Sequence, residues 1–220
     1  MDIDRPPDIV VIAGGAPLDA RHVASIGPST RVIAADAGVS AAGDLGWEVD
    51  VAVGDFDSIR AEDLARLDEL AREVRRFPSD KDATDLELAL AVAVESGPAR
   101  VLLAGIEGGR PDHALANLLL AASERFASLE VEVLIEHGRA WVVRDQLAGT
   151  LPTRSTVSVI PVHGAAHVSI DGVRWPLDRR LLEPGTTLAI SNEVADGPFT
   201  LDVHAGVVLC ITPRDSEVHP

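Results

Sequence analysis

Aspartates are the residues of this sequence whose type and spacing most clearly indicate chemistry. Five of them follow apolar, β-branched runs, namely Asp36, Asp55, Asp57, Asp82 and Asp85. Carboxylates gathered in one place repel one another and raise each other's pKa. A bound Mg²⁺ ion removes that repulsion, because it prefers carboxylate oxygens and leaves coordination positions free for phosphates. The sequence therefore predicts a Mg²⁺ site, and Gly54 would permit the tight turn that aims Asp55 and Asp57 the same way.

Two cations accompany these carboxylates in the sequence. Lys81 is the only lysine among 19 basic residues, which favours a position that needs a compact ammonium group rather than a guanidinium. Arg110 would supply a planar fork for phosphate oxygens. Carboxylates, a divalent metal, lysine and arginine together are typical of phosphoryl-type transfer. Neither GxxxxGK[ST] nor GxGxxG occurs, so a nucleotide would be held without a P-loop or a dinucleotide-binding turn.

Helix capping offers a second interpretation of several of these residues. Asp82 could be a helix N-cap with Asp85 at the third helical position, and Ser58 could cap the helix that follows it. Pro111 suits the first helical position, and Asp112 would then lie favourably at the positive end of the helix dipole. For each residue taken singly, capping and ligand binding both stay open. Capping does not explain why the same sheet edge also carries Asp55, Asp57, Lys81 and Arg110.

The elements that must position these side chains alternate between strands and helices over the first two thirds of the chain. The predicted strands are Ile9–Ala13, Arg31–Asp36, Val49–Val53, Glu73–Phe77, Arg100–Ala104 and Glu130–Ile135. The predicted helices lie near Asp19–Ile26, Ser40–Leu45, Ala61–Glu73, Ala83–Ser96 and Pro111–Phe126. This alternation predicts a parallel sheet, whose strand ends meet at one edge where ligands bind. On the last helix, His113 and Asn117 are four residues apart and would share one face.

From about Arg139 the pattern changes to short apolar runs separated by turn residues. The predicted strands there are Ala140–Arg144, Thr156–Pro161, His167–Ile170, Thr187–Ile190, Thr200–His204 and Val207–Ile211. No helical period is evident, which indicates a smaller antiparallel β-sandwich. We therefore expect an α/β fold in which a parallel-sheet domain (1–138) precedes an antiparallel β-sandwich domain (139–220).

Composition restricts the classes of function. The net charge of −16 disfavours binding to nucleic acids and to anionic membranes. No apolar run approaches the roughly 20 residues that a membrane helix needs. A single cysteine excludes a disulfide framework, and the acidic start of the chain is unlike a secretory signal. These features predict a cytoplasmic protein.

At these motifs the sequence resembles the thiamine pyrophosphokinase family. The matching segments, in family order, are ADAG (35–38), GDFDSI (54–59), KDATDLELAL (81–90), GGRPDHALANLLL (108–120), TVSVIP (156–161), GVRWPL (172–177) and SNE (191–193). The resemblance implies transfer of pyrophosphate from ATP to thiamine, giving thiamine diphosphate and AMP. It also implies a homodimer with active sites between the subunits.

The resemblance further implies roles for individual residues. Asp55, Asp57 and Asp82 look like Mg²⁺-binding or catalytic carboxylates, together with Lys81 and Arg110 as catalytic cations. The residues that would hold ATP are Asp36, Thr84, Asp85, Arg110, Asp112, His113 and Asn117. Trp175 looks like the ring that stacks on the thiamine pyrimidine, with Ser191 and Asn192 hydrogen-bonding to thiamine.

Two alternatives to this function remain open at the level of sequence. The family's small residues before Ser191 are replaced by Leu188-Ala189-Ile190, which leaves room for another hydroxymethyl heterocycle, such as a pterin, as the acceptor. The second alternative is a nucleotide-binding module without turnover. Five converging carboxylates favour an enzyme over a pure binding module. The sequence does not identify the general base.

Overall fold

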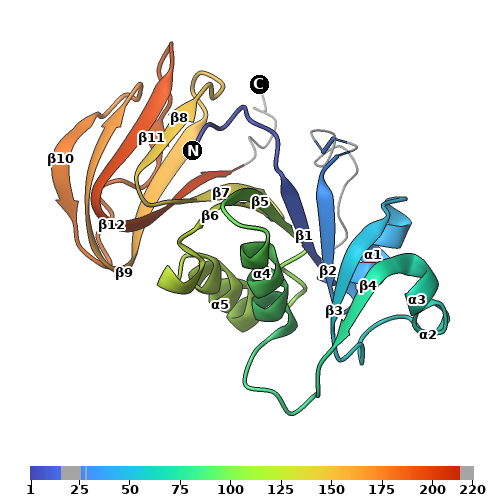
Figure 1. The fold of residues 1–220 in the computed structure, drawn as a ribbon. Helices are drawn as coiled ribbons and strands as arrows, with labels where there is room; N and C mark the ends of the chain where they lie inside the picture. Colours follow the sequence, from blue (N-terminus) through green and yellow to red (C-terminus); the bar gives the residue numbers. More distant parts are fainter. Residues whose placement is uncertain (16–25, 28, 214–220) are drawn as a thin grey trace. The chain divides into compact units, whose positions relative to one another are not determined.

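The computed structural model describes residues 1–15, 26–27 and 29–213. These residues form two compact units (Figure 1). The α/β unit comprises Pro6–Leu120 and Val133–Glu136, and the β unit comprises Met1–Arg5, Ala121–Glu132 and His137–Pro220. The fold class is therefore confirmed, while the domain limits 1–138 and 139–220 stay a prediction. No helix of the described residues is long and apolar enough to cross a membrane.

A parallel sheet forms the centre of the α/β unit. Its strands lie in the order β5-β1-β2-β3-β4, and all adjacent pairs are parallel. Their bounds are β1 (Ile9–Ala13), β2 (Arg31–Ala35), β3 (Val49–Gly54), β4 (Ala71–Arg76) and β5 (Ala99–Ala104). Consecutive strands thus add on one side of β1 as far as β4, and the chain then returns to place β5 on the other side. The point at which the strand order changes direction therefore lies between β1 and β5.

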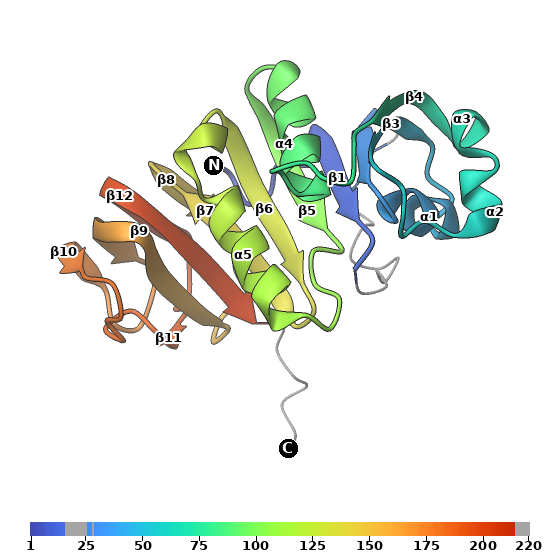
Figure 2. The same cartoon turned by 90° about the horizontal axis from the view of Figure 1, so that it is seen from below.

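Helices cover this sheet. The described helices of the unit are α1 (Gly38–Asp44), α2 (Ala61–Leu64), α3 (Leu67–Leu70), α4 (Asp85–Glu95) and α5 (Pro111–Ala121). On one face, Val10 and Ile12 of β1 share a buried core cluster with Val39 of α1. The alternate residue Val11 is equally buried and points to the opposite face. Helix α4 packs against β1, β2 and β3. Figure 2, seen from below, shows it beside β1.

Two of the predicted helices are wrong in extent. The segment predicted as one helix over Ala61–Glu73 forms two single turns, α2 and α3, and its last residues already belong to β4. The break comes at Arg66, whose backbone (φ −120°, ψ 16°) is not helical and lets Leu67 turn into the core. The helix predicted to reach Phe126 ends at Ala121 and is followed by a separate 3₁₀ turn. The helix predicted near Asp19–Ile26 lies almost wholly outside the described residues.

The β unit is built on two long antiparallel strands, β9 (Thr156–Asp171) and β12 (Phe199–Pro213). β12 also pairs with β7 (Gly138–Val143) and with β8 (Gln146–Gly149). β9 also pairs with β10 (Leu177–Leu182) and with the short β11 (Asn192–Glu193). Their inward side chains form one buried cluster that includes Trp141, Leu147, Phe199 and Leu201. Strand β6 (Leu129–Ile135) completes the described strands.

The structure corrects the predicted strands of the β unit. Thr156–Pro161 and His167–Ile170 belong to one continuous strand, as do Thr200–His204 and Val207–Ile211. The residues between the two halves of β12 form a bulge, where the pairing register shifts around Ala205. Gly206 permits this bulge, since its φ is +84° and a Cβ there would lie 2.5 Å from the Ala165 carbonyl oxygen. Thr187–Ile190 is a turn rather than a strand, and β8 and β10 were not predicted.

Candidate active site

Asp36 occupies the first turn beyond β2. Its backbone has a positive φ of 48°, which few residues other than glycine adopt. The Asp36 N–H donates to the Val53 carbonyl oxygen at 2.8 Å, and the Asp36 carbonyl accepts from the Val39 N–H at 3.1 Å. These bonds tie the turn to β3 on one side and to the start of α1 on the other. The Asp36 carboxylate is therefore fixed at the carboxyl edge of the sheet.

The turn after β3 carries the next two carboxylates. Phe56 also has a positive φ, of 61°, and its ring is only 2% exposed in the core shared with α1. This buried ring anchors the turn and leaves Asp55 and Asp57 on either side of it. The Asp57 N–H donates to Asp55 Oδ1 at 3.3 Å. The Ser58 hydroxyl donates to Asp57 Oδ1 at 2.8 Å, so Ser58 supports a carboxylate instead of capping a helix.

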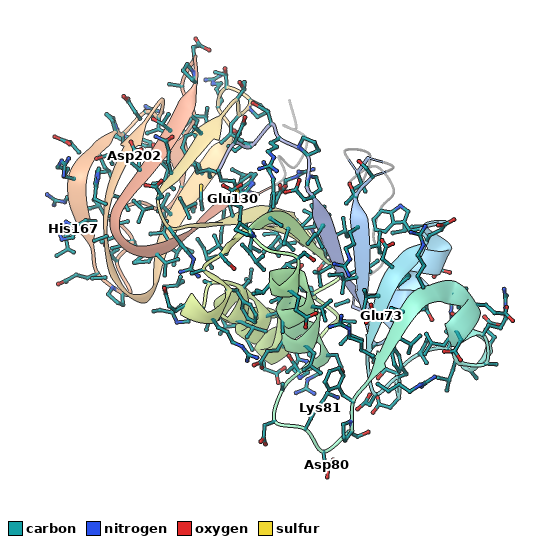
Figure 3. The ribbon with its side chains drawn as sticks, viewed as in Figure 1. Glu73, Asp80, Lys81, Glu130, His167 and Asp202 are labelled. Carbon is teal, nitrogen blue, oxygen red and sulfur yellow. The ribbon has the colours of Figure 1, made fainter. Side chains whose placement is uncertain are left out.

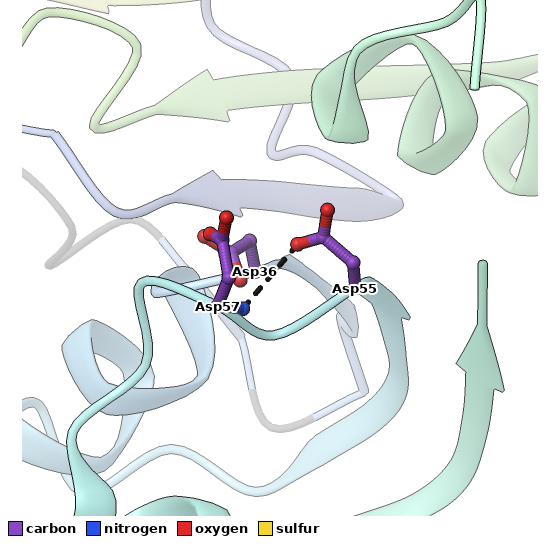
Figure 4. A group of neighbouring side chains, drawn as sticks. All are labelled: Asp36, Asp55 and Asp57. Atoms are coloured by element: carbon purple, nitrogen blue, oxygen red, sulfur yellow. Dashed lines mark hydrogen bonds between the residues drawn. The ribbon is translucent and has the colours of Figure 1, made fainter. Parts of the chain in front are cut away.

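These two turns bring three carboxylates together (Figure 4). One oxygen from each of Asp36, Asp55 and Asp57 lies within 4.8 Å of the other two. Asp36 and Asp55 are partly buried, whereas Asp57 is exposed to solvent. The strands β2 and β3 are neighbours in the sheet, which is why residues so far apart in sequence meet here. A group of three carboxylate oxygens with one open side is a suitable donor set for Mg²⁺.

The electrostatics of the group also fit a cation. Burial, and secondarily the nearby Asp85 carboxylate, raise the pKa of Asp36 despite a hydrogen bond from the Ala37 N–H. Asp36 Oδ1 is buried and has no hydrogen-bond partner among the described residues. The pKa of Asp55 is instead lowered, chiefly by the hydrogen bond from the Asp57 N–H and also by Lys81. An uncompensated buried carboxylate oxygen is costly, and a metal ion would compensate it.

Lys81 provides the positive charge nearest to this group. It lies in the loop between β4 and α4 (Figure 3). Its ammonium group is 3.2 Å from Asp55 Oδ2 and 3.0 Å from Asp85 Oδ1. Desolvation lowers the pKa of Lys81, but the hydrogen bonds with Asp85 and Asp55 outweigh it and raise the pKa overall. Lys81 is therefore a fixed cation between two carboxylates.

Helix α4 places Asp85 in this arrangement. Thr84, and not Asp82, is the N-cap, and its hydroxyl oxygen accepts from the Glu87 N–H at 3.2 Å. Asp85 is then the first helical residue. Gly54 makes room for it, because a Cβ on Gly54 would lie 3.1 Å from Asp85 Oδ1 and 3.3 Å from Asp36. The absence of a side chain at Gly54 thus allows the carboxylates of Asp36 and Asp85 to approach.

The remaining predicted residues of the α/β unit are not part of this group. Asp82 is exposed and lies outside the set of three carboxylates. Arg110 forms an exposed ion pair with Asp112 in the first turn of α5, which lowers the pKa of Asp112 to about 2. His113 is exposed, and the Asn117 amide donates to the Ile106 carbonyl oxygen at 2.9 Å.

Strand order explains why the loop after β5 stays apart from the carboxylates. β5 lies on the far side of β1, so β1 separates it from β2. Adjacent strands are about 4.8 Å apart, which puts the end of β5 roughly 10 Å from the end of β2. The alternation of strands and helices in the sequence predicts a common edge but does not give the order along it.

In the β unit, Trp175 and Asn192 are in contact, and Ser191 precedes Asn192. Trp175 is 54% exposed, with the Arg174 guanidinium carbon 4.8 Å from the centre of its ring. Asn192 is only 6% exposed, and its amide bonds to the backbone of Trp175. Ser191 is exposed, has a positive φ of 56°, and donates its N–H to the Ser158 hydroxyl oxygen at 3.0 Å.

Sequence reasoning missed two supporting residues of the carboxylate group. Ser58 was interpreted as a cap, although its position directly after Asp57 already placed its hydroxyl within reach of that carboxylate. Phe56 was not singled out at all. An aromatic residue between two aspartates in a polar turn was a usable signal, because so large an apolar side chain in a turn is expected to be buried. Arg76 lies over its ring, 5.3 Å from the centre.

Two models from one protein family match the chain. The model described as "Thiamin pyrophosphokinase, catalytic domain" matches residues 25–133. The model described as "Thiamin pyrophosphokinase, vitamin B1 binding domain" matches residues 145–208. The first match contains the carboxylate group and Lys81, and the second contains Trp175 and Asn192.

Individual proteins agree with the family models. A thiamine pyrophosphokinase from Bacillus subtilis is 29% identical over 173 residues, which cover 74% of this chain and 78% of that protein. The crystal structure of a thiamine pyrophosphokinase from Bacillus subtilis superposes with a TM-score of 0.82 at 27% identity, covering 94% of this chain and 99% of the other. The structure from Geobacillus thermodenitrificans gives a TM-score of 0.81 at 28% identity, covering 96% and 99%.

Proposed function

The chain belongs to the thiamine pyrophosphokinase family, and from this premise we propose that it transfers pyrophosphate from ATP to the hydroxyl group of thiamine. The products are thiamine diphosphate and AMP. The observation that carries the proposal is the meeting of Asp36, Asp55 and Asp57 beside Lys81 at the carboxyl edge of the parallel sheet. This is a place where α/β folds bind ligands, and it holds the charges that phosphate chemistry requires.

We propose that Asp36, Asp55 and Asp57 hold Mg²⁺. When bound, the ion would neutralise charge on the polyphosphate, as metal ions do in phosphoryl transfer generally. The chain's own residues account for the rest of the site. Phe56 anchors the turn that carries two of the carboxylates, and Ser58 orients Asp57 by its hydrogen bond. Asp82, which the resemblance also implies as a metal ligand or catalytic carboxylate, stays a prediction.

Lys81 and Arg110 are the proposed phosphate-binding cations. Lys81 is held between Asp55 and Asp85, so its position is set before the nucleotide arrives. Arg110 is 65% exposed on the loop that follows β5, and exchange of Asp112 for a phosphate would use the same bidentate fork. With Lys81 near the end of β4 and Arg110 beyond β5, the two cations suit an extended polyphosphate rather than a single phosphate group.

Trp175 is the proposed platform for the acceptor. Trp175 is 54% exposed, so much of its apolar ring surface is in contact with water, and a planar ligand stacked on the ring would cover that surface. Thiamine presents an electron-poor pyrimidine ring, and such rings stack well on indole. We propose further that the enzyme is cytoplasmic and acts as a homodimer with active sites between subunits, as the resemblance implies.

A competition assay tests this function. Purified protein is incubated with Mg²⁺, ATP and equal concentrations of thiamine and a hydroxymethyl pterin, and AMP and both diphosphate products are quantified. We expect thiamine diphosphate and AMP in equal amounts and no pterin diphosphate. A pterin product would show that the acceptor is wrong, and binding of Mg·ATP without AMP release would show a module without turnover.

The Asp57→Asn variant connects the activity to the carboxylate group. Loss of one metal-binding charge is expected to lower kcat by about a hundredfold or more, the usual effect of removing a charge that stabilises a transition state. Asp178→Asn, at an exposed carboxylate on β10, is the matched control and should keep wild-type turnover. If Asp57→Asn also keeps wild-type turnover at saturating Mg²⁺, the metal assignment is wrong.

A further inference from the structure

The backbone just before Trp175 is held by hydrogen bonds to residues 193–195, at and directly after the end of β11. The Ala195 N–H donates to the Gly172 carbonyl oxygen at 2.9 Å, and the Arg174 N–H donates to the Glu193 carbonyl oxygen at 2.7 Å. Val173 and Val194 form an isolated antiparallel bridge between the same segments. This short ladder ends one residue before the exposed ring.

The side chain of Asn192 continues the ladder where the backbone pairing stops. Its Oδ1 atom accepts from the Trp175 N–H at 3.1 Å, and its Nδ2 atom donates to the Trp175 carbonyl oxygen at 2.7 Å. The amide therefore satisfies both polar backbone groups of one residue, as a paired strand would do. The next residue, Pro176, has no N–H with which to prolong the pairing.

The bonding capacity of the Asn192 amide is almost used up by these contacts. Oδ1 accepts a second bond, from the Glu193 N–H at 2.9 Å, so both of its lone pairs are engaged. One of the two Nδ2 hydrogens goes to Trp175. The orientation of the amide is fixed by its neighbours, because a flipped amide would set an NH₂ group against two N–H donors. With 6% of its surface exposed, Asn192 has little left to offer a ligand.

The Trp175 ring itself has a different neighbour. The Arg174 guanidinium lies over one face, 4.8 Å from the ring centre, and it is 3.6 Å from Glu193. The ring is thus restrained from one side by a cation, while its backbone is restrained by an amide. The ring nevertheless remains 54% exposed.

From this geometry we propose that Asn192 is a positioning residue for Trp175: its amide fixes the backbone from which the ring projects, so that the ring stacks on the acceptor without reorganising. The proposal rests on the proposed function for the nature of the acceptor. It replaces the direct hydrogen bond from Asn192 to thiamine that the resemblance implies. Ordering a stacking group in advance improves binding because less conformational freedom is lost when the ligand arrives.

A double-mutant cycle on the full chain distinguishes the two roles. Thiamine KM, ATP KM and kcat are measured for Asn192→Ala, Trp175→Ala and the double variant. We expect Asn192→Ala to raise thiamine KM by about tenfold, with ATP KM nearly unchanged, since a displaced binding group weakens the contact it makes. In the Trp175→Ala background the same substitution should add almost nothing, because residues that act through one another are not additive.

Two kinetic results would overturn the proposal. The first is an increase in thiamine KM by the same factor in both backgrounds, which means that Asn192 contacts the acceptor directly. The second is no increase at all in Asn192→Ala. Thr153→Ala is the matched control, because it removes another side-chain hydrogen bond of the β unit, 2.9 Å long to Asp196, without touching Trp175.

A spectroscopic measurement keeps the proposal separate from the proposed function. Protein labelled with 5-fluorotryptophan gives one ¹⁹F signal for each of its three tryptophans, Trp47, Trp141 and Trp175. We expect Asn192→Ala to shift or broaden the Trp175 signal alone, whether or not thiamine is the acceptor. An unchanged Trp175 signal would refute the positioning role. If Asn192→Ala fails to fold, Asn192→Ser, which keeps one acceptor oxygen, is measured in the same way.

Discussion

Asp36 is the residue at which the structure and the proposed chemistry are most closely connected. Its carboxylate is partly buried, and Oδ1 has no hydrogen-bond partner among the described residues. A side chain chosen only for stability at this position would not be charged. The raised pKa, caused first by burial and then by Asp85, shows that the folded chain disfavours the ionised form when no cation is present.

A pH-dependent stability difference follows from this raised pKa. The folded protein binds the Asp36 proton more tightly than the unfolded chain, so stability is lost as pH rises from the pKa of the unfolded chain to the raised pKa of the folded protein, and the loss is complete above that raised pKa. In EDTA at pH 8, Asp36→Asn should therefore melt at a higher temperature than wild type, because the variant carries no charge at this partly buried position. The difference should shrink toward pH 4.

Thermal melts at the two pH values check this prediction, with Asp178→Asn as the control for removal of an exposed carboxylate. Adding Mg²⁺ at pH 8 should reverse the order, because only the wild-type chain keeps all three ligands. A metal-free Asp36→Asn protein that melts below wild type at pH 8 would contradict this account of Asp36.

At the scale of elements, the start of α4 is the connection between the loop that carries Lys81 and the carboxylate group. Thr84 accepts the Glu87 N–H through its hydroxyl and so fixes the first turn, which carries Asp85. Because Asp85 contacts Lys81, the cap also fixes the ion pair. The helix is thus stabilised at the end where the site is built.

Thr84→Ala should destabilise the protein by about 1 kcal/mol, the typical effect of removing an N-cap side chain. Thr84→Ser keeps the hydroxyl oxygen and should lose only a few tenths of that amount. Urea unfolding of the three proteins measures the difference. Equal stabilities for Thr84→Ala and wild type would show that the cap contributes nothing.

The same scale shows what the sequence could predict. Asp36, Asp55 and Asp57 were correctly expected to meet, because the carboxyl ends of parallel strands share an edge whatever their order. Arg110 was expected there too, but alternation of strands and helices does not reveal that β5 lies beyond β1. The order of the strands depends on how the whole sheet packs, and a local sequence pattern does not predict it.

Strand lengths in the β unit were misjudged for a related reason. Thr200–His204 and Val207–Ile211 were predicted as separate strands, whereas Gly206 between them allows a bulge inside one strand that continues to Pro213. A glycine with positive φ has the same appearance in a sequence whether the chain turns away or only shifts its register. The distinction depends on the Ala165 carbonyl oxygen across the sheet, which is remote in sequence.

At the scale of the whole molecule, charge constrains how the substrates arrive. A chain with a net charge of −16 repels free ATP, and the repulsion weakens when the polyphosphate carries Mg²⁺. In the proposed reaction, the α/β unit supplies the groups for the phosphate chemistry, and the β unit supplies the platform for the acceptor. In that reaction these parts together transfer a pyrophosphate group, and not a single phosphoryl group.

A labelling experiment tests this reaction by following the phosphorus atoms of ATP into the products. Purified protein is given Mg²⁺, thiamine, and ATP labelled with radioactive phosphorus at either the α- or the γ-position. We expect the α-label only in AMP and the γ-label only in thiamine diphosphate, in equal amounts. Formation of ADP, with the γ-label in thiamine monophosphate or in free phosphate, would contradict the proposed reaction.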